Sequence, residues 1–272
     1  MIGPVIDGRS LGFGSTLAAM KVENNHLEQV EEIISRHPGV SHGYERDHQF
    51  NIWFTLSVPP DRQVEAELEK IQRTSCAETL ISLPVIKLFK IGAFFDLEGS
   101  DQAAGTNCGT RVNNQIFELA GKEKSIFNEI QQDLPLVPSP FNGMAERAGV
   151  ELELFLDVCR SLLEKGIIRR FSASINHRQA GFAANGMACF RVPSEEIEAV
   201  GAQLAKKKEV SHCYERKTNQ FWPYNLFAMI HGHTKDSCQK IVNEISRERG
   251  LKDFALLFST NEFKKTRVKY LL

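Results

Sequence analysis

The chain has no long apolar run. None of its 272 residues belongs to an uninterrupted apolar stretch of about 18 residues, the length that a membrane-spanning helix needs. The N-terminus has no basic segment that leads into an apolar one, as a secretory signal would. We therefore expect a cytoplasmic protein that makes no use of a membrane.

Closely spaced cysteines and a strong net charge are also lacking. No Cys-x-x-Cys pair occurs, which excludes the usual zinc knuckle and cluster-binding runs. The formal net charge is -1, so any anion site must be local. We interpret most of the six cysteines as small buried apolar side chains in a reducing compartment. They are Cys76, Cys108, Cys159, Cys189, Cys213 and Cys238.

What the sequence does contain is an internal repeat. Residues 41–46 read Ser-His-Gly-Tyr-Glu-Arg, and residues 211–216 read Ser-His-Cys-Tyr-Glu-Arg. The sequences on both sides of the hexapeptides repeat as well: Gly-Phe precedes each hexapeptide and Phe-Lys follows it. These dipeptides are residues 12–13 and 89–90 in the first copy, and 181–182 and 263–264 in the second. The chain is therefore a tandem repeat of one domain type.

Hydrophobic spacing predicts the order βαββαβ in both copies. In the first copy we expect a strand at 17–22, a helix at 25–37, strands at 40–47 and 51–58, a helix at 59–75 and a strand at 81–97. In the second copy the corresponding segments are 187–192, 194–207, 210–217, 224–231, 235–249 and 254–270. This is the split order of a ferredoxin-like domain, in which two helices cover one face of a four-stranded antiparallel sheet.

The segment between the copies predicts a winged helix-turn-helix. Helices are expected at 118–134, 141–148 and 151–165, followed by a two-stranded wing at 167–182. Residues 1–15 align with 168–184, so we expect the first copy to begin with the remnant of a wing and to lack its own winged helix. The fold class is α+β, and we expect these domains: 1–97, the first βαββαβ domain; 98–115, a linker; 116–183, the winged helix-turn-helix; and 184–272, the second βαββαβ domain.

The expected recognition helix is acidic, which argues against DNA binding. It carries Glu151, Glu153 and Asp157 against Arg160, whereas contacts to DNA phosphates rely on Lys and Arg. We expect no DNA partner, and we interpret the winged helix as an interaction or structural module.

Each hexapeptide should present a row of polar side chains on one face of its strand, because alternate residues of a strand share a face. The rows are His42, Tyr44 and Arg46 in the first copy and His212, Tyr214 and Arg216 in the second. Apolar helices must cover one sheet face, so we place the rows on the other face, where each could line a pocket closed by the other copy. An exposed strand with ordinary cross-strand polar pairs is the alternative.

Neighbouring strands add polar and basic side chains to this candidate site. Those expected to bind a ligand are Tyr224, Asn225, Lys264, Lys265 and Arg267 in the second copy and Lys90 in the first. Lysines on an end strand can instead protect a sheet edge. The aromatic turn at 221–224 either flanks a flat ligand or packs as a hairpin tip.

A winged helix followed by βαββαβ resembles the Lrp/AsnC family of amino-acid-responsive regulators. Four segments are more specific and resemble the siroheme decarboxylase family, Lrp/AsnC-like proteins of alternative haem and haem d1 biosynthesis. They are the hexapeptide 211–216, the Pro-Tyr-Asn-Leu-Phe strand 223–227 with His-Gly at 231–232, the end strand 259–265, and the wing residues 167–171 with 176–178. The chain resembles a fusion of two homologous subunits.

The resemblance implies a carboxy-lyase that removes CO2 from two acetate side chains of siroheme and gives didecarboxysiroheme. It implies no cofactor beyond the iron of the siroheme substrate, and either a homo-oligomer or a homologous partner subunit. The many carboxylates of siroheme suit local clusters of Arg and Lys. Two alternatives stay open: a haem- or siroheme-binding sensor without turnover, and a transcription regulator of the Lrp/AsnC type.

Under this resemblance the second copy is expected to be the catalytic one. His212 or His231 would deliver a proton, and either could instead be the axial ligand of the substrate iron. Tyr214 would orient the acetate, and Arg216 and Lys264 would hold carboxylates that do not react.

The first copy differs at two positions of this expected site. It has Trp53 and Ser57 where the second copy has Phe227 and His231. We expect the first copy to close the pocket.

Overall fold

The first copy folds as the predicted βαββαβ unit. The structure is a computed structural model that describes residues 2–92, 115–173 and 184–270. Val30 and Ile34, four residues apart, form the buried face of the first α-helix. The elements are β2 (Gly14–Lys21), α1 (Leu27–Arg36), β3 (Val40–Arg46), β4 (Ile52–Val58), α2 (Val64–Thr74) and β5 (Thr79–Leu83).

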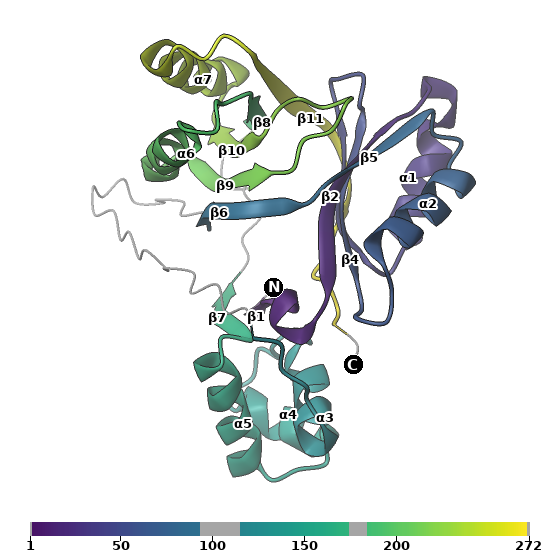
Figure 1. Cartoon of the computed structure of the whole chain (residues 1–272). Coiled ribbons are helices and arrows are strands. Elements are labelled where there is room, and N and C mark those ends of the chain that lie inside the picture. Colours follow the sequence, from purple (N-terminus) through teal and green to yellow (C-terminus); the bar gives the residue numbers. More distant parts are fainter. Residues whose placement is uncertain (1, 93–114, 174–183, 271–272) are drawn as a thin grey trace.

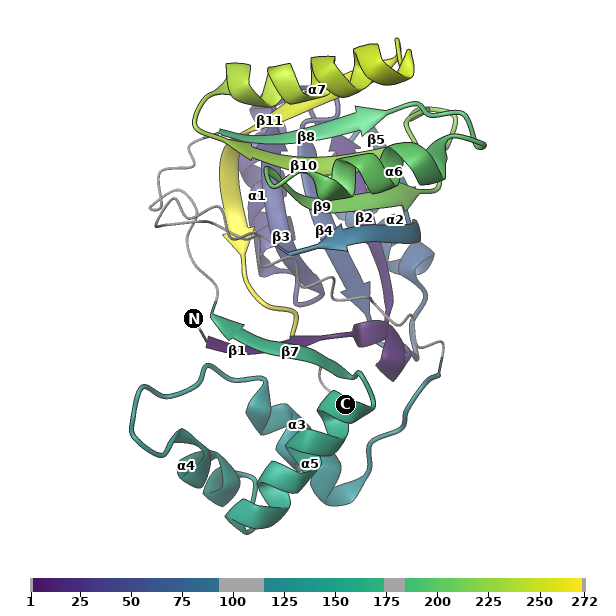
Figure 2. The same cartoon turned by 90° about the vertical axis from the view of Figure 1, so that its left-hand side faces the viewer.

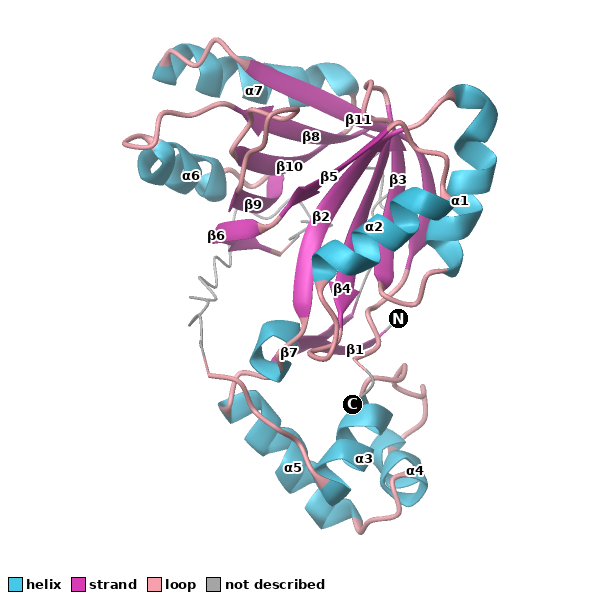
Figure 3. Cartoon of the chain, turned by 45° about the vertical axis from the view of Figure 1, so that its right-hand side comes forward, coloured by secondary structure: helices cyan, strands magenta, loops and turns pink. Residues whose placement is uncertain are grey.

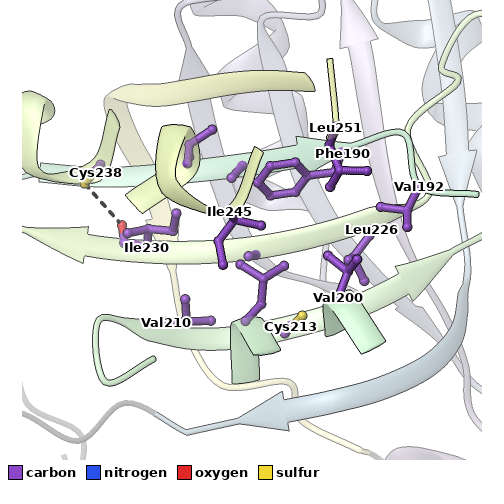
Figure 4. Packing of buried hydrophobic residues seen from close by; sticks show 14 of the residues in the cluster. Phe190, Val192, Val200, Val210, Cys213, Leu226, Ile230, Cys238, Ile245 and Leu251 are labelled. Atoms are coloured by element: carbon purple, nitrogen blue, oxygen red, sulfur yellow. Dashed lines mark hydrogen bonds between the residues drawn. The ribbon is translucent and has the colours of Figure 1, made fainter. Parts of the chain in front are cut away.

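The second copy repeats this order around its own apolar core. Its elements are β8 (Ala184–Phe190), α6 (Ile197–Lys206), β9 (Val210–Arg216), β10 (Leu226–Gly232), α7 (Lys235–Arg249) and β11 (Phe254–Lys265). Figure 4 shows the core between these strands and helices, where Phe190, Val200 and Ile245 are fully buried. Thr234 and Ser237 form a capping box that fixes the start of α7.

The two copies exchange strands at their C-terminal ends. The strand order is β5-β2-β4-β3-β11-β8-β10-β9-β6, in which β6 (Val85–Ile91) belongs to the first copy but pairs with β9 of the second. In return, β11 pairs with β8 through its first half and with β3 through its second half. Pro84 separates β5 from β6, and its missing N–H suits a break between strands. The prediction of one continuous strand from residue 81 is therefore wrong, because two strands with different partners stand there; residues 93–97 of the predicted strand lie outside the described residues.

One glycine explains the single difference between the hexapeptides. The aromatic ring of Phe263 packs on Gly43, where a Cβ atom would lie 2.2 Å from the ring. The corresponding ring of Phe89 packs instead on Gly201 of α6, at 2.5 Å from a built Cβ atom. Cys213 is therefore tolerated at the position where the first copy requires Gly43.

The helices cover the outer faces of the sheets, and the inner faces pack against each other. Helices α1 and α2 lie on one side of the molecule and α6 and α7 on the other, with the strands between them (Figure 1; Figure 3). A separate buried cluster joins the inner faces, and it consists of Ala19, Phe50, Trp53, Ile81, Leu83, Met187, Cys189, Trp222, Phe227 and Leu257. Burial of this apolar surface holds the two copies together.

The segment between the copies forms the predicted group of three helices. They are α3 (Gly121–Ile130), α4 (Pro140–Arg147) and α5 (Leu152–Glu164), followed by β7 (Ile168–Ala173). Their core also includes Leu11 and Phe13 of the first copy. Figure 2 shows this group below the sheets.

The wing strand pairs with the N-terminus. Strand β7 is antiparallel to β1 (Ile2–Ile6), and the pair lies between the sheets and the three helices (Figure 2). The predicted second wing strand falls largely on residues 174–183, outside the described residues. Since residues 1–15 repeat the wing sequence, β1 and β7 are equivalent strands of the two copies, and their pairing follows the internal symmetry.

The α+β architecture and the two βαββαβ units are confirmed, whereas the exact domain limits at 97, 115 and 183 stay predictions. No helix within the described ranges is long and apolar enough to cross a membrane.

Candidate active site

Strand β9 carries a row of three polar residues toward the first copy. The rings of His212 and Tyr214 are stacked, with centroids 6.2 Å apart and an interplanar angle of 20°. The guanidinium carbon of Arg216 lies 4.9 Å from the centre of the Tyr214 ring. Nη1 of Arg216 donates a 2.8 Å hydrogen bond to the carbonyl oxygen of Leu83, so the row ends against the other copy.

Strand β3 repeats this row with similar geometry. The centroids of His42 and Tyr44 are 6.3 Å apart, and the guanidinium carbon of Arg46 lies 5.3 Å from the Tyr44 centroid. Nη1 of Arg46 donates a 3.1 Å hydrogen bond to the carbonyl oxygen of Leu257, as Arg216 does in the other direction. Burial lowers the pKa of Arg46 and of Arg216 to about 10, so both remain charged at neutral pH.

A cavity of about 210 Å³ lies beside the second-copy row. Its walls come from the N-terminal segment (Val5, Ile6, Asp7, Gly8, Arg9, Phe13), from β2 and β4 (Ser15, Thr16, Leu17, Thr55, Ser57), from β6 (Val85, Leu88, Ile91), from β7 (Arg169), from β9 (Tyr214, Arg216) and from Tyr270. Both copies and the wing therefore contribute to one cavity. The row of β3 does not line it.

Three guanidinium groups give this cavity a positive character. Arg9, Arg169 and Arg216 all line it, and all three attract the ionised form of Tyr214. Burial outweighs this attraction and raises the pKa of Tyr214, so its phenol stays protonated at neutral pH. Asp7 partly offsets the positive charge through ion pairs of 2.6 Å with Arg169 and 3.4 Å with Arg9.

Two histidines meet at a serine hydroxyl next to the Tyr214 ring. Oγ of Ser211 lies 2.8 Å from Nδ1 of His212 and 2.7 Å from Nε2 of His231. Burial, followed by the nearby His231 and His42 rings, lowers the pKa of His212 to about 4. His212 is therefore a neutral imidazole at neutral pH.

The first copy lacks the second histidine of this arrangement. Oγ of Ser41 lies 3.0 Å from Nδ1 of His42, which repeats the contact of Ser211 with His212. Ser57 occupies the position in β4 that corresponds to His231 in β10. The sequence difference between Ser57 and His231 therefore gives the two copies different side chains at the same place in the fold.

The neutral state of His212 predicts a pH dependence of stability. Between pH 6.5 and about 4 the unfolded chain binds a proton at His212 that the folded chain does not. The free energy of unfolding should therefore fall as the pH drops through this window. In urea unfolding at neutral pH and inside the window, His212→Gln should show a smaller fall than the wild type. His42 and His48, whose pKa values burial also lowers, and Glu67, whose pKa is lowered by its hydrogen bond with His37, add slope in both proteins. Equal falls in the two proteins would contradict this assignment.

Two lysines that are expected to bind the ligand form hydrogen bonds with helix ends. Nζ of Lys90 donates a 2.7 Å hydrogen bond to the carbonyl oxygen of Lys207, the C-cap residue of α6. Nζ of Lys264 makes the same 2.7 Å contact with the carbonyl oxygen of His37, the C-cap residue of α1. Each lysine thus ties an exchanged strand to the helix of the other copy, where a cation is favourable.

Replacing Lys264 by methionine should lower the free energy of unfolding by about 1 kcal/mol, since one hydrogen bond to a helix end is lost while the aliphatic stem remains. Ligand affinity should not change. Urea unfolding and a ligand titration of the same variant measure the two quantities. Weaker ligand binding at unchanged stability would restore the predicted binding role of Lys264.

Asn225 and Tyr224 also take structural roles. Oδ1 of Asn225 accepts a 2.9 Å hydrogen bond from the backbone N–H of Val192, and Nδ2 donates a 2.8 Å bond to the Val192 carbonyl oxygen. Both polar atoms of the Asn225 side chain are thereby used within the second copy. The Tyr224 ring packs edge-on against Trp222, with centroids 5.2 Å apart. Trp222 of the aromatic turn is therefore packed, whereas Phe221 is 53% exposed.

The other basic residues of the end strand lie apart from the cavity lining. Arg267 contacts the carbonyl oxygen of Ile2 at 3.4 Å and a carboxylate oxygen of Asp133 at 3.5 Å. Lys265 forms a 3.3 Å ion pair with Glu262. A direct ligand contact of either residue stays a prediction.

Sequence reasoning missed four residues of this site. Simple alternation places Ser211 on the strand face opposite to His212, and Asp7, Arg9 and Arg169 are not among the predicted site residues. The alignment of residues 1–15 with the wing was the available signal, because it places the N-terminal segment and the wing in equivalent positions.

Comparison with known proteins identifies the family. A sequence profile of the AsnC-like ligand binding domain matches residues 10–90 and 179–264. A second profile, the siroheme decarboxylase NirDL-like HTH domain, matches residues 123–169. A siroheme decarboxylase from Hydrogenobacter thermophilus is 42% identical over 273 residues, which cover 99% of this chain and 80% of that protein. The chain belongs to the siroheme decarboxylase family.

Other siroheme decarboxylases support this membership. The siroheme decarboxylase beta subunit of Methanosarcina barkeri is 45% identical over 140 residues, which cover 52% of this chain and 92% of that subunit. A crystal structure of the siroheme decarboxylase NirDL matches with a TM-score of 0.78 and 38% identity, and the match covers 100% of this chain and 79% of that one. A NirDL structure in co-complex with an iron-uroporphyrin III analogue gives a TM-score of 0.77 and 36% identity. The predicted resemblance to siroheme decarboxylases is thereby confirmed.

Proposed function

We propose that this chain removes CO2 from two acetate side chains of siroheme and gives didecarboxysiroheme. The observation that carries this proposal is the cavity where Arg9, Arg169 and Arg216 surround the Tyr214 phenol beside the neutral ring of His212. Membership of the siroheme decarboxylase family supports the same reaction. The product would serve haem or haem d1 biosynthesis.

The guanidinium groups are suited to hold the carboxylates of the substrate. Planar guanidinium donors pair with carboxylates in bidentate geometry, and these charge-assisted hydrogen bonds are stronger than neutral ones. Arg216 is fixed by its bond to Leu83, whereas the Arg9 side chain is 45% exposed and has room to adjust. We assign these groups to carboxylates that do not react, because a firm grip on the reacting carboxylate would oppose its loss.

The reaction needs an electron sink and a proton. The bond between the acetate methylene and its carboxylate breaks, CO2 leaves, and the electron pair passes into the conjugated macrocycle. The methylene carbon then takes a proton and becomes a methyl group, so each CO2 released consumes one proton. The neutral His212 ring relays this proton: it takes up a proton that enters the site, passes it to the methylene carbon and returns to its neutral form, while the Tyr214 phenol orients the acetate by hydrogen bonding. We propose no cofactor beyond the iron of the substrate.

The size of the cavity limits how the substrate fits. Pockets for small molecules commonly have volumes of about 300–1,000 Å³. A volume of about 210 Å³ therefore encloses one acetate-bearing edge of the macrocycle and not the whole tetrapyrrole. Thr55 and Ser57 of the first copy line the same cavity as Tyr214, which supports the expected role of the first copy in closing the pocket.

We also propose that the chain acts in the cytoplasm as a homo-oligomer or with a homologous subunit, and without DNA. Relatives in Stutzerimonas stutzeri are NirH and NirL subunits of a siroheme decarboxylase, each matching about half of this chain. The acidic residues Glu151, Glu153 and Asp157 at the start of α5 disfavour contact with DNA phosphates.

Anaerobic incubation of the purified chain with siroheme, followed by mass analysis, tests the proposed reaction. We expect the mass to fall by one and then two CO2 units. An unchanged mass with a shifted visible spectrum would indicate a siroheme-binding sensor and would overturn the proposal. Salt-dependent binding to duplex DNA without turnover would indicate a transcription regulator.

A further inference from the structure

The Ser211 hydroxyl lies at the junction of two histidine rings. The residue is 2% exposed, and its Oγ atom is within 2.8 Å of a nitrogen of each ring. Its remaining contact is a 3.5 Å approach to the carbonyl oxygen of Met229. A buried hydroxyl with two ring nitrogens as its nearest partners must satisfy both of them at once.

An irregular strand pairing brings Ser211 into this position. Met229 pairs with His212 and Ile230 pairs with Val210, so the register shifts and leaves Ser211 without a Cα partner in β10. Such a bulge re-aims the side chain of the extra residue. The bulge explains why Oγ of Ser211 reaches Nδ1 of His212, although simple alternation would place the two side chains on opposite faces.

The hydroxyl has a single hydrogen, and this couples the two rings. It can donate to Nδ1 of His212, to Nε2 of His231 or, at the longer distance of 3.5 Å, to the carbonyl oxygen of Met229, but only to one of them. The two ring nitrogens are nearer, so we infer that one of them accepts it. The nitrogen that does not accept this hydrogen must itself carry one and donate it to Oγ. The tautomer of one ring therefore sets the hydrogen position on the facing nitrogen of the other ring.

The first copy has the same bulge and serine but only one of the two histidines. Its strand pairing shifts at the same place, between Val40 and His42, and Ser41 again contacts Nδ1 of the next histidine. Ser57 replaces the second histidine there. The first copy therefore keeps the bulge and the serine without a coupled pair of rings.

We propose that Ser211 is a positioning residue for the decarboxylation, which couples the tautomers of His212 and His231 and leaves Nε2 of His212 for the substrate. Contact with Ser211 occupies Nδ1 of His212, and the ring is held in place by its stacking on Tyr214. The inference rests on the proposed function for its chemistry, whereas the coupling of the two rings is a property of the chain alone.

Nitrogen-15 NMR of the imidazole rings in the wild-type chain tests the coupling without any activity measurement. We expect one of the two nitrogens facing Ser211, Nδ1 of His212 or Nε2 of His231, to carry hydrogen and the other to carry none. Hydrogen on both nitrogens, or on neither, would overturn the coupling. This result does not depend on whether the chain decarboxylates siroheme.

Ser211→Ala tests the role in turnover, with Ser41→Ala as the matched control. Loss of one hydrogen bond that orients the ring should lower kcat about 10-fold, with little change in KM. Ser211→Thr, which keeps the hydroxyl, should restore most of kcat, and Ser41→Ala should keep the wild-type kcat.

Equal kcat in Ser211→Ala and the wild type, or equal losses in both alanine variants, would overturn the proposed role of Ser211 in turnover. If Ser211→Ala does not fold, the threonine variant and the NMR result decide. Absent turnover in the wild type would refute the proposed function instead.

Discussion

Replacing His212 by alanine is expected to lower kcat for siroheme decarboxylation by about 100-fold or more, the usual contribution of a positioned general acid. His212 is stacked on Tyr214, which lines the cavity, and it is neutral at working pH. Its loss removes the ring that passes a proton to the methylene carbon, while the guanidinium groups remain. Single-turnover assays under anaerobic conditions measure kcat, and KM should change little.

His42→Ala is the matched control for this variant, because His42 has the same place in the first copy. Tyr214 and Arg216, the other members of the His212 row, line the cavity, whereas Tyr44 and Arg46 of the His42 row do not, so His42→Ala should retain most of the activity. A large loss in His42→Ala with full activity in His212→Ala would transfer the catalytic role to the first copy.

Replacing Trp222 by alanine should lower the free energy of unfolding by about 3–5 kcal/mol, the range for a buried Trp or Phe that becomes Ala. Trp222 is 1% exposed and lies in the cluster that joins the inner faces of the two sheets. Its ring packs edge-on against Trp53 at 5.0 Å and Phe50 at 5.9 Å, both from the first copy. Urea unfolding measures the loss.

Trp222→Phe is the milder variant at this position. It keeps an aromatic ring and removes the Trp222 Nε1–H group, which is buried without a hydrogen-bond partner in the described part of the chain. The loss should therefore be clearly smaller than for alanine. Equal stability of the alanine variant and the wild type would mean that Trp222 does not hold the copies together.

Local pattern was enough to predict most of the fold. Val30 and Ile34 repeat at helical spacing, and the hexapeptides alternate as strands do, so the helices and strands followed from periods of 3.6 and 2. The strand exchange did not follow, because β6 has no local feature that selects its own sheet or its neighbour. Pro84 marked the break between β5 and β6 but not the destination of the chain after it.

The candidate site was predictable where it repeats and was missed where it depends on long-range contacts. His212, Tyr214 and Arg216 were found because alternation and duplication both indicated them. The contacts of Lys90 and Lys264 with helix ends were not predicted, because a basic strand is compatible both with an anion site and with contacts to helix ends. Their carbonyl partners belong to the other copy, and no local signal marks them.

The position of the substrate iron tests the central claim most directly. A crystal structure of the chain soaked anaerobically with siroheme would locate the iron by its anomalous scattering. We expect the iron between β9 and the inner face of β2 and β4, nearer to His212 than to His42, with substrate carboxylates on Arg169 and Arg216. An iron bound at the surface, or beside the β3 row and away from Tyr214, would contradict the proposed active site.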